Sequence, residues 1–190
     1  MHVSLRSLAG KIALFLSLVA AAFAMSPGAS AQRIALKTNA IDYMILSPNL
    51  TLEARLSRVL SIQLGLAACP ITKPIHDIKL TNFRVEPELR YWFNRPMARH
   101  FVALSFSAVN YSLRHADRYF TGDAVLAGVS YGYSVVLSDH WNMEAEIGVG
   151  IGTFSGYDYV GANNKPDGNN FRHVLPVPVR FGLSFGYIFK

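Results

Sequence analysis

Cysteine is the rarest residue type in this chain: Cys69 is the only one among 190 residues. A single thiol excludes an internal disulfide, and the absence of a His/Cys cluster around it predicts no metal site and no other cofactor. Charged residues make up 16% of the chain, and no Lys/Arg-rich run indicates nucleic acid as a partner. After residue 31 no apolar run reaches about 18 residues, so no membrane-spanning helix is expected there. Hydrophobic residues still make up 51% of the chain, and they are dispersed.

The first 31 residues have the features of a signal peptide. Arg6 and Lys11 form a positive start, an apolar core follows, and Ala29-Ser30-Ala31 offers a small-x-small cleavage site. The apolar core is too short for a comfortable membrane-spanning helix. We therefore predict export and cleavage after Ala31. The remaining residues 32–190 fit one domain, whose net charge falls from +6 to +4 because Arg6 and Lys11 are removed.

The last stretch of the chain, residues 177–190, carries the clearest pattern. Its odd positions are apolar or aromatic, whereas its even positions from 180 to 186 read Arg, Gly, Ser, Gly. This period of two predicts a β-strand with one apolar face and one small, polar face. An outer-membrane barrel gives both faces a reason, since the apolar row meets lipid and the small row fits a narrow interior. The predicted lipid-facing row is Val179, Phe181, Leu183, Phe185, Tyr187 and Phe189.

The same alternation recurs in seven earlier segments, which brings the predicted number of strands to eight. These segments are 33–44, 50–57, 60–68, 83–93, 102–108, 125–135 and 141–152. Short turns near 57–58, 94–99 and 138–140 alternate with longer connections at 69–81, 113–123 and 157–173; the short first connection, 45–48, is an exception. Short periplasmic turns and longer external loops are typical of membrane barrels. The predicted fold is all-β: an eight-stranded antiparallel up-and-down transmembrane β-barrel with a filled polar interior.

Alternation alone leaves open which face points inward. A soluble periplasmic barrel that binds an apolar ligand would place the aromatic side chains in its core and the charges in water. The Gly and Ser residues on the charged face, the bulk of the apolar face and the asymmetry of the connections favour the membrane orientation. Charges inside a barrel must pair, because an isolated buried ion is very costly. The predicted interior ion-pair network is Lys37, Glu53, Arg55, Arg84, Glu86, Glu88, Arg90, Glu144, Glu146 and Arg180.

Five segments carry a resemblance to a known family: residues 37–39, 48–50, 85–92, 129–133 and 140–150. Over nearly the whole mature chain they resemble a family of small exported proteins of anaerobic Gram-negative bacteria, described only as a domain of unknown function. The resemblance implies a fold like an outer-membrane barrel, similar in architecture to OmpA/OmpX-type barrels. Some members are similar in genomic setting to fimbrial or surface-adhesion systems. The resemblance implies no activity and no catalytic residue.

These features predict a non-enzymatic outer-membrane protein with a structural, adhesive or surface-assembly role exerted through its external loops. The expected partners are outer-membrane lipid and lipopolysaccharide, the barrel-assembly machinery, and a surface or fimbrial protein. Phe93, Phe101 and Trp141, near the short turns, are expected to anchor the barrel at the membrane interface. An alternative is an enzyme that modifies lipid A at the barrel rim. Its candidate residues would be His115, Asp117, Asp123, Ser155, Asp158 and His173.

Overall fold

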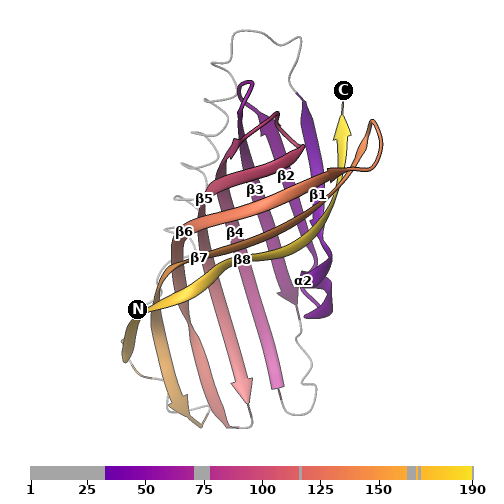
Figure 1. Ribbon diagram of the computed structural model, residues 1–190. Coiled ribbons are helices and arrows are strands. Elements are labelled where there is room, and N and C mark those ends of the chain that lie inside the picture. The colour runs from indigo at the N-terminus through magenta and orange to yellow at the C-terminus, as the bar shows by residue number, and fades with distance from the viewer. Residues whose placement is uncertain (1–32, 71–77, 116, 162–165, 167, 190) are drawn as a thin grey trace. The chain divides into compact units, whose positions relative to one another are not determined.

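The computed structural model describes residues 33–70, 78–115, 117–161, 166 and 168–189. The predicted signal peptide, residues 1–31, lies outside these residues. The elements are β1 (Ile34–Asn39), α2 (Ala40–Met44), β2 (Asn49–Arg55), β3 (Leu60–Pro70), β4 (Ile78–Trp92), β5 (Arg99–His115), β6 (Arg118–Val136), β7 (Trp141–Val160) and β8 (Phe171–Phe189) (Figure 1). In the described part of the chain, no helix is long and apolar enough to cross a membrane.

The eight strands form one closed antiparallel ring. Each strand pairs with its neighbour along the chain, and β1 pairs with β8, from Ile34 opposite Phe189 to Asn39 opposite Ser184. This up-and-down order confirms the predicted all-β class, the number of strands and their antiparallel pairing. The short connections predicted near 57–58, 94–99 and 138–140 all lie at one end of the ring, as consecutive antiparallel strands require.

The strands differ greatly in length. Strands β1 and β2 have 6 and 7 residues, whereas β6, β7 and β8 have 19, 20 and 19. Strands β4–β7 therefore continue well past helix α2, at the end away from the short turns (Figure 1). We call this outlying part, formed by β4–β8 beyond the end of β1, the sheet extension.

The extension corrects three predicted loops. The expected loop 69–81 overlaps two strands, because β3 ends at Pro70 and β4 begins at Ile78. Residues 113–123 were expected to form a loop, yet β5 and β6 pair without interruption from Asn110–Asp123 to His115–Arg118. The expected loop 157–173 is shorter, because β7 ends at Val160 and β8 begins at Phe171. Segments 113–123 and 157–173 are rich in polar residues and therefore resemble loops in sequence, yet parts of each continue the paired strands.

Asparagine side chains complete the sheet where β1 stops. The sequence predicted a strand over 33–44, but the strand ends at Asn39, whose side chain accepts a hydrogen bond from the backbone of Ile41 and caps α2. The same Asn39 Oδ1 accepts from Leu183 N at 3.1 Å, in the place of a strand partner for β8. Across the other edge, Asn49 Oδ1 accepts from Asn39 N at 2.7 Å, and Asn49 Nδ2 donates to Asn39 O at 2.9 Å. Two of the segments that carry the family resemblance, residues 37–39 and 48–50, thus meet at this junction.

A β-bulge corrects the alternation predicted for the last strand. Gly148 of β7 lies opposite Arg180, but the next residue, Val149, lies opposite Pro178. Val179 is therefore an extra residue between two paired positions, and it is buried with 7% exposure instead of facing outward. Upstream of the bulge the faces change parity, so Val177 lies on the inner side of the sheet beside Gly152. Sequence alternation cannot reveal a bulge when both flanking residues are apolar.

Glycine lets β6 and β7 come unusually close together. Gly128 and Gly150 lie opposite each other in the register of these strands. A Cβ added at Gly150 would lie 2.1 Å from the carbonyl oxygen of Ala127 and 2.6 Å from Gly128 Cα. Because both obstacles are backbone atoms, no side-chain rotation could make room for it.

We expect Gly150→Ala to destabilise the fold by roughly 1–3 kcal/mol, the usual cost of overpacking. The free energy of unfolding in urea, followed by gel mobility, measures this change. Gly168→Ala is the matched control, because a Cβ at Gly168 meets no atom within 4 Å. Equal stability of the two variants would contradict the close approach of β6 and β7.

Candidate functional site: the ion-pair network inside the ring

Ten charged side chains from six elements form one connected network inside the ring. Members come from β1, α2, β2, β4, β7 and β8, so the network ties together both ends of the sequence. The pairs are Lys37–Glu53, Lys37–Glu144, Arg84–Asp42, Arg84–Glu86, Arg90–Glu53, Arg90–Glu88, Arg90–Glu144, Arg90–Glu146, Arg180–Glu86 and Arg180–Glu88. The alternation of β4 explains its share, since every second residue from Arg84 to Arg90 faces inward.

Arg90 is the centre of the network. Its guanidinium group contacts four carboxylates and is 1% exposed. Nη1 donates to Glu144 at 2.6 Å, and Nη2 donates to Glu146 at 2.7 Å. The planar guanidinium carries five N–H donors, which a lysine ammonium could not direct at four acceptors in this geometry.

The strands without interior charges supply hydroxyl groups. Ser61 of β3 donates to Glu53, Ser105 of β5 to Glu88 and Ser130 of β6 to Glu146. The network has six carboxylates against four cations, so these extra donors satisfy acceptors that the cations leave open. Every strand of the ring therefore contributes to the same polar interior.

The structure unites nine of the ten predicted network residues and corrects the tenth. Arg55 does not reach the interior ions; its Nε donates to the backbone oxygen of Ser57 at 2.8 Å. Arg55 is the last residue of β2, where the chain turns away from the ring. The tenth member of the network is instead Asp42 of α2, whose carboxylate lies 2.8 Å from Arg84 Nη2. Asp42 was not selected because residues 40–44 were expected to form a strand.

An apolar plug closes the interior at the short-turn end. Trp92 and Phe101 are fully buried there, with ring centroids 4.6 Å apart, and the Arg90 guanidinium carbon lies 4.3 Å from the Phe101 centroid. Met97, in the turn before β5, packs with Ala35 and Ile188. The expectation that Phe101 anchors the outside is therefore wrong. The alternation of the strand could have indicated this, because Phe101 directly precedes Val102, which faces outward.

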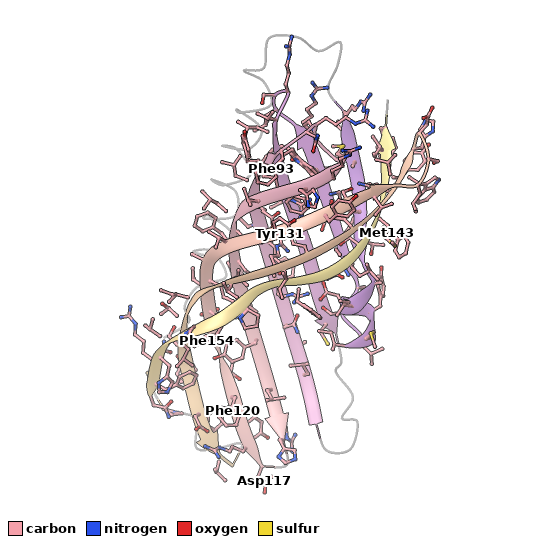
Figure 2. The ribbon with its side chains drawn as sticks, viewed as in Figure 1. Phe93, Asp117, Phe120, Tyr131, Met143 and Phe154 are labelled. Atoms are coloured by element: carbon pink, nitrogen blue, oxygen red, sulfur yellow. The ribbon has the colours of Figure 1, made fainter. Side chains whose placement is uncertain are left out.

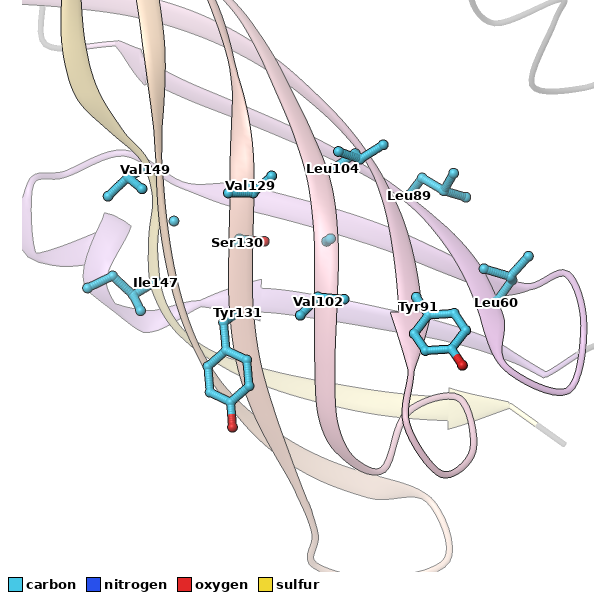
Figure 3. A pocket seen from close by; sticks show the side chains of 12 residues that line it. Leu60, Leu89, Tyr91, Val102, Leu104, Val129, Ser130, Tyr131, Ile147 and Val149 are labelled. Carbon is cyan, nitrogen blue, oxygen red and sulfur yellow. The ribbon is translucent and has the colours of Figure 1, made fainter.

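The outer face of the ring is apolar and exposed. Phe181, at 64% exposure, Phe185 and Phe189 of the predicted row point outward, and Leu183 and Tyr187 are partly exposed. Phe93 and Trp141 are also exposed, as expected. Across the neighbouring strands, outward side chains line a shallow apolar groove (Figure 3): Leu60, Leu89, Tyr91, Val102, Leu104, Val129, Tyr131, Ile147 and Val149. Apart from the plug, most large apolar side chains therefore face outward, whereas the paired charges face inward.

The rim residues considered for catalysis do not form a nucleophile–base pair among the described residues. Ser155 and His173 lie on opposite faces of the extension, because Ser155 pairs with Arg172 and His173 pairs with Phe154. Arg118 donates two hydrogen bonds to Asp158, at 3.0 and 2.7 Å, which lower the pKa of Asp158 below its usual value. Asp123 instead accepts from Asn110, at 2.9 Å, while His115 and Asp117 lie at the β5–β6 turn.

Residues 14–189 match the sequence profile of a family described as protein of unknown function, DUF3575. The match covers most of the chain and confirms the resemblance to a family described as a domain of unknown function. No curated protein matches the chain. In the described residues, no three His, Cys, Asp or Glu side chains are grouped so that they could hold a metal ion.

We expect Arg90→Met to destabilise the folded protein by about 3–5 kcal/mol, because it leaves buried carboxylates without a cation. The midpoint of urea unfolding, with folded and unfolded protein separated by gel mobility, measures the loss. Arg55→Met is the matched control and should cost less than about 1 kcal/mol, since Arg55 makes only an exposed hydrogen bond. Comparable losses in the two variants would show that the network does not hold the ring.

Proposed function

We propose that this chain, which belongs to the DUF3575 family of proteins of unknown function, is an outer-membrane barrel that acts through the part it presents beyond the membrane. The proposed role is structural, adhesive or surface-assembling, and no catalysis is invoked. The observation that carries the proposal is the combination of a charged, closed interior with an apolar outer face. Water would disfavour that outer face, whereas hydrocarbon disfavours charges unless they are enclosed and paired.

A band of aromatic residues supports a membrane boundary at the short-turn end. Outward-facing rings contact one another around that end: Tyr91 with Phe93, His100 with Tyr131 and Tyr133, and Tyr187 with His140, Trp141 and Phe189. His100 Nδ1 and the Tyr131 hydroxyl are also 2.6 Å apart. Amphipathic rings of this kind concentrate at the headgroup level of membrane barrels.

The plugged interior argues against a pore. Trp92 and Phe101 fill the short-turn end, and Arg90 with its four carboxylates fills the middle. An eight-stranded barrel has room for side chains but not for an aqueous channel. The sheet extension is then the part left to meet a partner. Its outer face carries polar and aromatic groups, including the stacked pair Tyr119 and Tyr159, whose ring centroids are 5.0 Å apart.

Val129→Lys tests the membrane orientation directly. Val129 is 57% exposed and lies in the middle of the outer apolar face. In lipid vesicles the lysine should cost about 2–4 kcal/mol of folding free energy, as charges do at the middle of a bilayer. Thr121→Lys, on the outer face of the extension, is the matched control and should cost little. If both variants refold as stably as the wild type, the outer face is not in hydrocarbon.

Fractionation and co-purification test the location and the role. We expect the protein in the outer-membrane fraction, with heat-modifiable gel mobility, and a surface protein co-purifying with it from intact membrane. Tyr119→Ala should weaken that co-purification without changing heat modifiability, since the side chain lies outside the ring. A deletion strain with altered lipid A mass, restored by the wild-type chain, would instead favour an enzyme.

A further inference from the structure

The last strand has a neighbouring strand on only one side over much of its length. Strand β7 pairs with β8 from Phe171 onward, whereas β1 pairs with it only from Ser184 to Phe189. Before Ser184, no strand of the described chain lies on the other side of β8 (Figure 1). We call the side of residues 171–178 that faces away from β7 the free edge. Phe154, labelled in Figure 2, marks the part of β7 that pairs with this stretch, opposite His173.

The β-bulge determines which backbone groups point to the free edge. In an antiparallel ladder, successive residues direct their N–H and C=O groups alternately to the two sides of the strand. Ile188 N donates to His140 O at 2.7 Å, so even-numbered residues near the end of β8 face β7. The extra residue at the bulge, Val179, reverses this order. Four residues before the bulge therefore face the free edge: Arg172, Val174, Pro176 and Pro178.

Proline occupies two of these four positions. Proline has no N–H group, so Pro176 and Pro178 leave the free edge with half of its donors. Both residues are exposed. The carbonyl of Val149, opposite Pro178, confirms the direction: it points toward β6, where a Cβ added at Gly128 would lie 2.3 Å from it. Neither proline therefore removes a hydrogen bond to β7, and proline is tolerated in a sheet under that condition.

Asn39 occupies the backbone groups of β8 that follow the bulge. Its Nδ2 donates to Phe181 O at 3.4 Å, and its Oδ1 accepts from Leu183 N at 3.1 Å. Helix α2 begins at the next residue, and Ile41 of this helix lines one cavity together with Phe181. An extended chain that approached β8 from this side would therefore find open donors only near the beginning of the strand.

An exposed strand edge is a template for another chain, because its unpaired N–H and C=O groups can continue the sheet. A second copy of this chain is the partner that the edge fits. Every copy presents the same edge, and two identical edges can pair antiparallel about a two-fold axis. The apolar side chains of Val174 and Leu175 are exposed beside it and would be covered by such pairing.

We propose that Pro176 and Pro178 prevent the free edge of β8 from pairing with the same edge of a second copy, so that the ring remains a single chain. Two missing donors on each edge remove hydrogen bonds that this pairing would need, while the pairing with β7 is left intact. The proposal goes beyond the proposed function and does not depend on the membrane location, since it concerns the strand edge alone.

Restoring the missing donors tests the proposal. Pro176→Thr combined with Pro178→Thr returns two N–H groups to the edge and introduces residues that favour strands. Sedimentation equilibrium of the refolded chain in density-matched detergent micelles measures the mass of the protein. We expect the wild type at the mass of one chain and the double variant at twice that mass. Pro48→Thr, before β2, is the matched control and should keep the mass of one chain. A folded double variant that stays a single chain would overturn the proposal, as would a control that dimerises equally.

A third substitution locates the contact. Val174→Pro, added to the double variant, removes another donor from the same edge and should restore the mass of one chain. A dimer that persists in this triple variant uses another surface and overturns the proposal. A wild-type dimer that Val174→Pro separates would also overturn it, because the two natural prolines would then not protect the edge. Urea unfolding checks that each variant folds, and Pro176→Thr alone decides by the same measurement should the double variant not fold.

Discussion

The enclosure of charge is the constraint on which the structure depends. An ionised group in a low-dielectric interior is tolerated only when paired and hydrogen-bonded, and Arg90 meets four carboxylates under these conditions. The carboxylates come from β2, β4 and β7, so the arginine is satisfied only when strands from both halves of the chain surround it. The charge of Arg90 is therefore fully neutralised only when the ring is closed.

A period of two was enough to predict most of the arrangement. Alternation in β4 placed Arg84 to Arg90 on one face, and the need for partners then required carboxylates from other strands. Glycine and serine opposite the aromatic residues of β8 indicated which face was narrow. These predictions succeeded because side-chain direction in a paired strand follows from sequence position alone.

The predictions that failed concern positions where strand pairing is irregular or where polar residues occur within a strand. Val179 was placed outward because a bulge adds one residue without any change in composition. Arg55 was assigned to the interior although it is the last residue of its strand. Residues 113–123 were taken for a loop because Arg114, Asp117 and Arg118 interrupt the apolar alternation there. Asp42 was missed with helix α2, whose five residues are too few for a helical period to be recognised.

Contacts between residues far apart in the sequence have a consequence for the folding of the newly synthesised chain. Lys37 donates to Glu144 across 107 residues, and Asn39 accepts from Leu183 across 144. When only the first half of the chain has been synthesised, it therefore carries cations and carboxylates whose ion-pair partners are still missing. Contacts this distant in sequence form slowly. Ring closure therefore waits until the final strand has been synthesised, because a chain without β8 cannot form the β1–β8 ladder.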